Sequence, residues 1–170
     1  MAVIVPLREA HVPAAARLIA EAFNTAAADE RKSLAGSFNA AVAPRAFTFA
    51  ALESENVVGV IRLMSYGVPQ GWGDVALFSI FQFAVDPARR GRGVGHALMR
   101  HAEDFAAAVL ARGQNGCITL LDETKRGRPD SRFYEKQGYA SDAGRVEEGL
   151  PVLYKYVSRP RPQIFSRRNG

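Results

Sequence analysis

The sequence predicts an α/β domain in which a central mixed sheet carries helices on both faces. Three observations support this. An apolar, aromatic and β-branched run from Val75 to Val85 indicates a strand covered on both faces, and Asp86-Pro87 ends it because proline cannot continue a ladder. From Val94 to Arg112, apolar residues recur every three or four positions, which is typical of one helical face. Shorter strand and helix patterns flank this strand-helix unit on both sides.

The N-terminal region predicts one short strand and two helices. Val3-Ile4-Val5 is a strand that Pro6 stops. Residues 11–23 place their apolar side chains on one helical face. A second helix is predicted from about Asp29 to Val42, ended by Pro44. Its inward-facing residues are expected to be Leu34, Phe38, Ala41 and Val42.

The segment that follows predicts an antiparallel meander. Residues 46–52 and 57–64 have strand patterns, and residues 53–56 join them at the length of a hairpin. A glycine-rich loop at 66–74 leads back to the long strand at 75–85. Strands connected in this order pair antiparallel with their neighbours.

The long helix is expected to end at Gly113, which is placed to cap it. Its inward stripe is predicted as Val94, Leu98, His101/Ala102, Phe105 and Ala108/Val109. Cys117 to Leu121 then forms a short buried strand beside the long one. Arg128-Pro129-Asp130 opens a short helix that closes at Gly138. Two more extended segments follow, turned by Gly149-Leu150-Pro151, and the last spans 152–157.

Length and composition fit one domain, residues 1–158, followed by a basic tail, residues 159–170. The formal net charge is +5, but four arginines lie in the tail, so the rest of the chain carries about +1. No apolar run approaches the length of a membrane span, and the N-terminus lacks the pattern of a signal peptide. We therefore expect a cytoplasmic protein. The single cysteine, Cys117, is expected to be a small buried side chain.

The turn between the long strand and the long helix has the composition of an anion site. Glycines at 91, 93 and 95 allow positive φ and close approach to the main chain, and three arginines, at 89, 90 and 92, add charge. The amides at a helix N-terminus are unpaired and carry partial positive charge, which suits a pyrophosphate. The alternative is a tight connection with solvated arginines. Neither a Walker A loop nor the dinucleotide fingerprint matches this spacing.

Two landmarks resemble one known family. Arg90-x-x-Gly93-x-Gly95, after a strand that ends in Ala84-Val85-Asp86-Pro87, resembles the acetyl-CoA signature Q/R-x-x-G-x-G/A of the GNAT superfamily of N-acetyltransferases. The segment Phe133-Tyr134-Glu135-Lys136-Gln137-Gly138-Tyr139 is similar to that family's Y-E-K-x-G-F/Y landmark. The resemblance covers residues 75–139 well and the rest only through element order. It implies the GNAT fold, with a mostly antiparallel sheet.

The resemblance also implies acetyl transfer from acetyl-CoA to a primary amine by direct attack in a ternary complex, without a metal. Carried over by position, the backbone of Phe83, Ala84 and Val85 would bond the pantetheine arm. The pyrophosphate would meet the turn and the first helical residues. This second set comprises Arg90, Gly91, Arg92, Gly93, Val94, Gly95 and His96.

By the same resemblance, Tyr134 is the general acid that protonates the departing thiolate, since a phenol keeps its proton at neutral pH. The alternative is an aromatic side chain packed on the short helix. Asp122 and Glu123 are candidates for the general base, or else loop acids. Some relatives use a glutamate on the central strand, where this chain has Ser79 and Gln82, which are poor bases. The base is therefore open.

The acceptor is open as well. Acidic residues at 29, 30, 147 and 148 would attract a cationic amine, or they are ordinary surface charge. Lys125-Arg126-Gly127-Arg128 stands where many relatives have a CoA-binding asparagine. A non-catalytic CoA-binding module and a nucleic-acid partner of the arginine tail are the alternative functions. Dimers are common in the family, so a homodimer is an expectation that comes from the resemblance and not from these residues.

Overall fold

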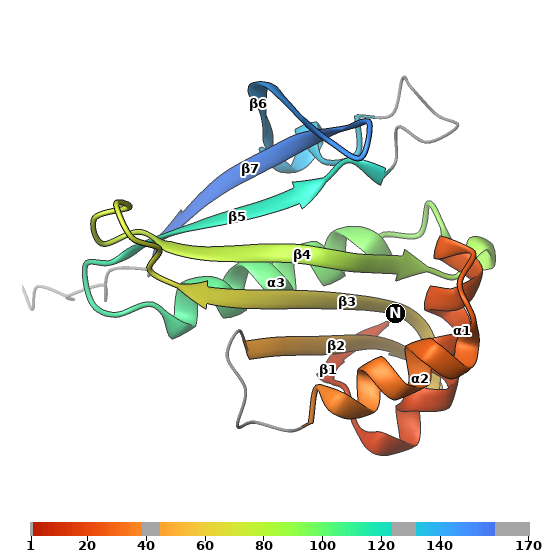
Figure 1. Cartoon of the computed structure of the whole chain (residues 1–170). Helices are drawn as coiled ribbons and strands as arrows, with labels where there is room; N and C mark the ends of the chain where they lie inside the picture. Colours follow the sequence, from red (N-terminus) through yellow and green to blue (C-terminus); the bar gives the residue numbers. More distant parts are fainter. Residues whose placement is uncertain (1, 39–44, 124–131, 159–170) are drawn as a thin grey trace, which may run out of the picture.

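The structure is a computed structural model that describes residues 2–38, 45–123 and 132–158. Within these residues the chain forms a seven-stranded sheet in the order β1-β2-β3-β4-β5-β7-β6 (Figure 1). The strands are β1 (Val3–Pro6), β2 (Arg45–Glu53), β3 (Asn56–Gly67), β4 (Ala76–Val85), β5 (Asn115–Leu121), β6 (Ala140–Glu147) and β7 (Leu150–Ser158). The α-helices are α1 (Val12–Phe23), α2 (Ala27–Gly36) and α3 (Val94–Val109). Single 3-10 turns lie at η1 (Glu9–His11), η2 (Pro87–Arg89) and η4 (Glu135–Gln137).

The sheet is antiparallel except at its centre. β2 to β4 form the predicted antiparallel meander, and β1 pairs antiparallel with β2 at the edge of the sheet. β5, β7 and β6 pair antiparallel in the other half. β4 and β5 are parallel neighbours, because α3 carries the chain back to the start of the sheet between them. The fold class that the sequence predicts, with its mixed but mostly antiparallel sheet, is confirmed.

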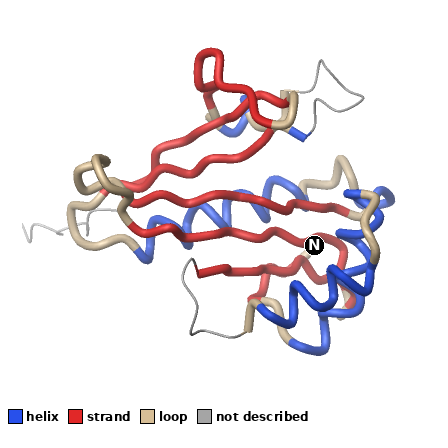
Figure 2. Tube along the Cα trace, in the orientation of Figure 1, coloured by secondary structure: helices blue, strands red, loops and turns tan. Residues whose placement is uncertain are grey.

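Helices cover both faces of the sheet, as expected (Figure 2). α1 and α2 pack on one face, where Ile19, Leu34 and Val60 share a buried cluster. α3 packs on the other face against a larger cluster that includes Leu98 and Ile118. Along β3, Val60 enters the first cluster whereas Ile61 and Leu63 enter the second, as the period of a strand requires.

The predicted inward stripe of α3 is correct at its start and wrong at its end. Val94, Leu98 and Ala102 are buried, but Val109 is exposed. The helix stops at Val109, and Leu110 enters the core in an extended conformation. The expected cap at Gly113 is therefore also wrong. That glycine instead occupies the next turn, which a hydrogen bond from Gln114 N to Ala111 O closes.

The second helix is shorter than predicted and begins earlier. α2 spans Ala27–Gly36, and its Leu34 is fully buried as expected. The Ser37 amide and hydroxyl both donate to the Leu34 carbonyl, which ends the helix. Phe38, expected to face inward, is therefore exposed. The remaining predicted residues of this helix, with Pro44, lie outside the described residues.

Two tight hairpins fix the register on either side of the sheet. The β2–β3 connection turns at Ser54 and Glu55, and the β6–β7 connection turns at Glu148 and Gly149, all with positive φ. Consecutive left-handed residues form the turn whose twist matches that of paired strands. The first hairpin is where the sequence predicted it. The second turns just before the predicted Leu150-Pro151, which begin β7.

The short helix near the second landmark is a single 3-10 turn, η4, which closes at Gly138 as predicted. Its predicted opening at Arg128-Pro129-Asp130 lies outside the described residues. The division into a domain at 1–158 and a tail at 159–170 stays a prediction, because the tail is not among the described residues. Cys117 is buried, as expected. No helix in the described parts of the chain has the length and apolarity to cross a membrane.

Candidate functional site

β4 loses its parallel neighbour halfway along. It pairs with β5 from Ala76 to Ile80, then continues to Val85 paired with β3 alone. β5 stays with β7, so β4 and β5 diverge toward the carboxyl end of β4 (Figure 1). Within the described residues no strand pairs with residues 81–85 on this side. This segment, which holds the predicted Phe83, Ala84 and Val85, offers strand backbone to an extended ligand.

A β-bulge marks the point where the two strands separate. Leu63 of β3 faces Ile80, and Arg62 faces Gln82, which leaves Phe81 as an extra residue on β4. The insertion reverses the alternation of side chains. Ile80 belongs to the core beneath α3, whereas Gln82 reaches the face covered by α2.

The bulge corrects one expectation from the sequence. β4 is not covered on both faces along its whole length, because Phe81 is 36% exposed. The Arg62 guanidinium lies over the Phe81 ring, 4.5 Å from its centroid. An exposed aromatic ring therefore lies at the position where β4 becomes free of β5.

The glycine turn enters α3 as the sequence predicts. Gly91 and Gly93 have φ of 75° and 83°, and a Cβ at either position would meet nothing within 4 Å. The first helical hydrogen bond runs from Ala97 N to Gly93 O, so the amides of Val94, Gly95 and His96 precede the helix's own bonding. These amides and the positive end of the α3 dipole suit an anion.

Gly95 serves a different purpose from the two turn glycines. It lies inside α3, where a Cβ would come 3.2 Å from Phe83 Cζ and 3.3 Å from Phe133 Cζ. The glycine therefore lets two aromatic rings pack against the helix backbone. Close approach, rather than backbone conformation, requires glycine here.

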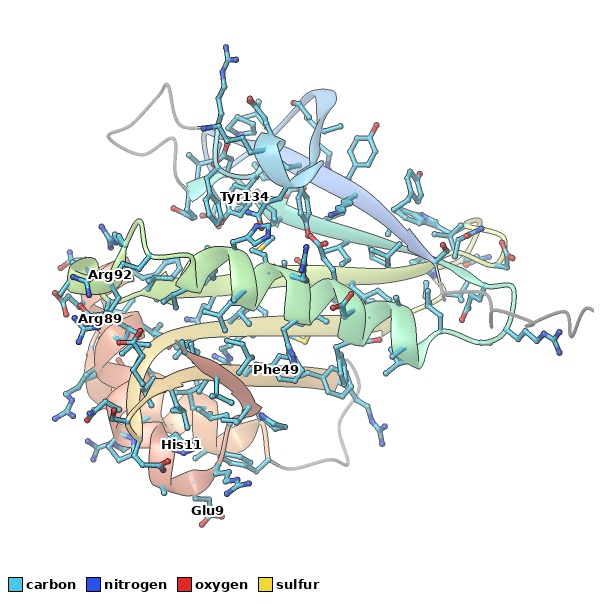
Figure 3. All side chains as sticks on the ribbon, turned by 180° about the vertical axis from the view of Figure 1, so that it is seen from behind. Glu9, His11, Phe49, Arg89, Arg92 and Tyr134 are labelled. Carbon is cyan, nitrogen blue, oxygen red and sulfur yellow. The ribbon has the colours of Figure 1, made fainter. Side chains whose placement is uncertain are left out.

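The three arginines of the turn differ in what they contact. Arg89 Nε forms an ion pair with Glu53 Oε2 at 2.7 Å, which fastens the turn to the β2–β3 hairpin. Arg90 Nε donates to the Val85 carbonyl at 3.3 Å, at the end of β4. Arg92 is exposed, beside Arg89 at the end of the molecule where α3 begins (Figure 3). Arg92 is therefore the arginine best able to meet a phosphate.

Tyr134 is buried where the second landmark begins. Its side chain is 4% exposed, with its ring centroid 5.0 Å from that of Phe133 and 6.4 Å from that of Phe83. The amides of Gln137 and Tyr139 both donate to its carbonyl, which fixes its backbone. Burial raises the pKa of the Tyr134 hydroxyl above its ordinary value of 10, so the phenol keeps its proton at neutral pH.

The two predicted acids lie close to that tyrosine. The charges of Asp122 and Glu123 are the next causes of its raised pKa, after burial. Asp122 is 2% exposed, and its amide donates to the Pro151 carbonyl at 3.0 Å. The structure thus brings Tyr134, Asp122 and Glu123 together at the end of β5.

A stack of aromatic rings joins β4 to the Tyr134 segment. The rings of Phe83 and Phe133 stack with centroids 5.7 Å apart. Beside Phe133 lies an open pocket of about 420 Å³. It is lined by His96, Arg132, Phe133, Lys136 and Gln137. The predicted His96 therefore faces a basic pocket next to the first turn of α3.

Sequence reasoning gave no indication of a buried polar network on the opposite face of β4. Glu30 of α2 accepts hydrogen bonds from Thr25 Oγ1 at 2.8 Å and from Gln82 Nε2 at 3.0 Å. Arg62 Nη1 donates to Gln82 Oε1 at 2.6 Å and to Ser33 Oγ at 3.0 Å. Burial lowers the pKa of Arg62, and the charge of Glu30 partly offsets this. Arg62, a lone charge in an apolar strand, was the available signal.

The basic segment at 125–128 lies outside the described residues. Among the residues that are described, no three His, Cys, Asp or Glu side chains gather in a way that could hold a metal.

Comparison with known proteins identifies relatives of this chain. Residues 44–141 match the family described as Acetyltransferase (GNAT) domain. Streptothricin acetyltransferase from Streptomyces lavendulae is 30% identical over 122 residues, which cover 68% of this chain and 58% of that protein. The chain thus matches little more than half the length of that relative.

Solved structures share the fold at lower identity. A transcriptional regulator from Bacillus halodurans superposes with a TM-score of 0.70 at 18% identity, covering 86% of this chain and 98% of the other. An aminoglycoside acetyltransferase from an uncultured soil metagenomic sample, in complex with sisomicin, gives a TM-score of 0.61 at 18% identity. That match covers 86% of this chain and 93% of the other.

Proposed function

The chain belongs to the GNAT acetyltransferase superfamily, and from this premise we propose that it moves an acetyl group from acetyl-CoA to a primary amine. The amine attacks the thioester directly while both substrates are bound. The observation that carries the proposal is the separation of β4 from β5 after Ile80, next to the free N-terminus of α3.

The two halves of acetyl-CoA match the two halves of this region. The pyrophosphate carries negative charge and suits the amides at 94–96, with Arg92 beside them. The pantetheine arm contains amides and suits the free strand backbone of residues 83–85. The Val85 carbonyl already accepts a hydrogen bond from Arg90 Nε. Pantetheine binding therefore displaces Arg90 from this carbonyl or uses the other backbone groups of residues 83–85.

The free backbone of β4 also has a chemical role in this proposal. An N–H group of residues 83–85 polarises the thioester carbonyl and stabilises the oxyanion that forms as the amine attacks. Such a donor is held in place by the pairing of β4 with β3, so it needs no reorganisation during the reaction.

Tyr134 then acts as the proton donor. Its buried phenol is protonated at neutral pH, and its backbone is fixed by two hydrogen bonds. A thiolate that leaves beside it takes the phenolic proton. Asp122 and Glu123, the acids predicted as candidate bases, lie near this donor. Their negative charges add to the effect of burial in raising the pKa of the Tyr134 phenol.

We propose a small cationic molecule as the acceptor. The support comes from similarity: one relative is named for acetylating streptothricin, and one structural neighbour is an aminoglycoside acetyltransferase with sisomicin bound. Both names point to antibiotics as the first amines to test.

The proposal is tested by measuring thiol release from acetyl-CoA with purified full-length chain. The probes are streptothricin, sisomicin, cadaverine and a peptide with a free N-terminus, and calorimetry measures acetyl-CoA binding in parallel. The expected result is binding of acetyl-CoA together with thiol release that depends on at least one probe. Binding without release for every probe would favour a non-catalytic CoA-binding module, and absence of binding would refute both.

The nucleic-acid alternative rests on the arginine tail alone. Deleting residues 159–170 should leave acetyl transfer unchanged under the enzymatic proposal. If DNA binding is the function, the deletion should instead abolish a salt-sensitive affinity for DNA. The cytoplasmic location and the dimer remain predictions.

A further inference from the structure

We propose that Glu30 is the residue that receives the acceptor: its carboxylate binds the substrate ammonium and takes its proton. This inference rests on the proposed acetyl transfer and names the base that the sequence left open. Glu30 lies in the first turn of α2, and its side chain is only 7% exposed.

The carboxylate is held in position, but no cation among the described residues contacts it directly. Thr25 Oγ1 and Gln82 Nε2 each donate to one of its oxygens, and the positive end of the α2 dipole favours its negative charge. Gln82 separates Glu30 from Arg62, because the amide oxygen accepts from the guanidinium while the amide nitrogen donates to the carboxylate. No ion pair joins Glu30 to Arg62 within the described residues. The Glu30 carboxylate is thus buried and oriented by hydrogen bonds, and Arg62 does not neutralise its charge through a direct ion pair.

Such an arrangement is expensive for a purely structural role. Burial of a carboxylate costs free energy unless hydrogen bonds and a close counter-charge compensate for it. Here the nearest counter-charge is the Arg62 guanidinium, which Gln82 separates from Glu30. Arg62 Nε is itself buried without a hydrogen-bond partner. A substrate ammonium supplies the missing direct partner of Glu30.

The β-bulge places this carboxylate next to the proposed reaction centre. Gln82, which contacts Glu30, is the second residue of β4 beyond its last pairing with β5. Because Phe81 is the extra residue, Gln82 is on the α2 face, whereas Phe83 and the Tyr134 segment contact each other on the α3 side. The base, Glu30, and the acid, Tyr134, would then lie on different faces of β4, along which the thioester is proposed to bind. Asp122 and Glu123, beside Tyr134, are on the side of the leaving group.

The surface beside Glu30 offers a way in for an amine. Thr25 is exposed at the connection between α1 and α2, and its hydroxyl is a donor that an ammonium can displace. Phe81, exposed at the bulge, provides apolar surface for the stem of the acceptor. The chemistry favours a primary ammonium on a flexible stem.

The step balances as follows. Glu30 takes one proton from the ammonium, and the freed lone pair forms the C–N bond to the thioester carbon while the carbonyl electrons move to oxygen. As the carbonyl re-forms, the C–S bond breaks, and sulfur leaves with its electron pair and takes a proton from Tyr134. A second proton leaves the new amide nitrogen and restores the tyrosine through solvent. Glu30 returns its proton to solvent, so one proton is released for each turnover.

The test compares Glu30→Gln with Glu21→Gln, which removes the same charge from an exposed residue of α1. Thiol release is measured from pH 6 to 10 with the four amine probes named above. Glu30→Gln should lower kcat/KM by roughly 100-fold or more near neutral pH. Its deficit should shrink toward pH 10, because the amine then loses its proton without a base. Glu21→Gln should match the wild type.

The pH dependence separates a base from a structural residue. The groups that face Glu30 are the Thr25 hydroxyl, the Gln82 amide and, beyond it, the charged guanidinium of Arg62. A structural role predicts a deficit that is the same at every pH, and that result would overturn the inference. Glu30→Asp keeps the carboxylate and covers the case in which the glutamine variant fails to fold. It should retain activity with the wild-type pH dependence, and loss of that dependence would also overturn the inference.

The outcome also distinguishes this inference from the proposed function. If Glu30→Gln transfers acetyl groups as fast as the wild type, the proposed function stands and Glu30 has no part in the reaction. A wild-type chain that binds acetyl-CoA but releases no thiol with any probe would overturn both.

Discussion

Phe83 and Phe133 stack with ring centroids 5.7 Å apart and an angle of 20° between the ring planes. Phe83 comes from the free half of β4, and Phe133 directly precedes Tyr134. Gly95 supports both rings from α3. The stack therefore connects the three parts of the proposed acetyl-CoA site, which are the free half of β4, the start of α3 and the Tyr134 segment. A substitution in one part should alter the positions of side chains in the others.

Gly95→Ala tests this connection. The added Cβ would come 3.2 Å from Phe83 Cζ and 3.3 Å from Phe133 Cζ, so both rings must shift. Alanine also favours the helix by about 1 kcal/mol, which offsets the crowding and keeps the unfolding free energy within about 1 kcal/mol of the wild type. Acetyl-CoA affinity measured by calorimetry should fall roughly tenfold, which corresponds to about 1.4 kcal/mol.

The matched control is Gly36→Ala in α2, where a Cβ meets nothing within 4 Å. That variant should bind acetyl-CoA as the wild type does. Equal affinities for the two variants would show that the aromatic stack does not influence the coenzyme site.

Arg92→Ala and Arg89→Ala should separate a phosphate contact from a structural ion pair. Arg92 is exposed at the start of α3, so its loss should raise the acetyl-CoA Kd roughly tenfold and weaken the salt dependence of binding. Arg89 is already paired with Glu53, so its loss should cost less than about 1 kcal/mol of stability and leave the Kd within about twofold. The reverse order of the two Kd values would contradict the assignment.

Alkaline unfolding should report the buried tyrosines. Burial raises the pKa of both Tyr134 and Tyr139 in the folded chain, whereas an unfolded chain ionises its phenols near pH 10. Stability from these groups is therefore fully present below about pH 10 and is lost as the pH rises further. The loss is at most about 1.4 kcal/mol per pH unit for each tyrosine.

Urea unfolding of the wild type and of Tyr134→Phe, measured at several pH values between 9 and 11.5, checks this expectation. The variant should show the shallower decline above pH 10, because one of the two raised phenols is gone. Parallel declines would mean that Tyr134 is not held protonated by the fold.

Gly59→Ala should be the most destabilising of these glycine changes. A Cβ at this position would lie 2.7 Å from Leu98 Cδ1 and 3.1 Å from Val94 Cγ1, between β3 and α3. Overpacking of this kind costs about 1–3 kcal/mol of unfolding free energy. Combining it with Leu98→Ala should cost less than the sum of the two single changes, and strict additivity would argue against the contact.

The features that the sequence predicted well are local. The turn at Gly91 and Gly93, the start of α3 and the closing of η4 at Gly138 each depend on a few neighbouring residues, and all are found as expected. Val109 and Gly113 were misassigned because Leu110 leaves the helix to enter the core, a packing choice that helical periodicity does not contain.

The features that the sequence missed depend on distant partners. The bulge at Phe81 exists only in the pairing of β3 with β4, so it cannot be recognised within β4 itself. In the sequence, Glu30 resembles an exposed acidic residue on a helix whose apolar pattern is weak. Its burial follows from contact with Gln82 and Thr25, which lie on other elements. Tyr134 and Asp122 were both predicted as site residues, but only through the family resemblance, because their proximity needs β5 and the second landmark to meet in space.

The most direct test of the account is the turnover of acetyl-CoA by Tyr134→Phe, with the amine that gives the fastest thiol release. If the buried phenol protonates the departing thiolate, kcat should fall roughly 100-fold or more, while the acetyl-CoA Kd stays within about threefold of the wild type. A variant with wild-type kcat, or one that has lost acetyl-CoA binding together with activity, would contradict the proposed role of Tyr134 as proton donor.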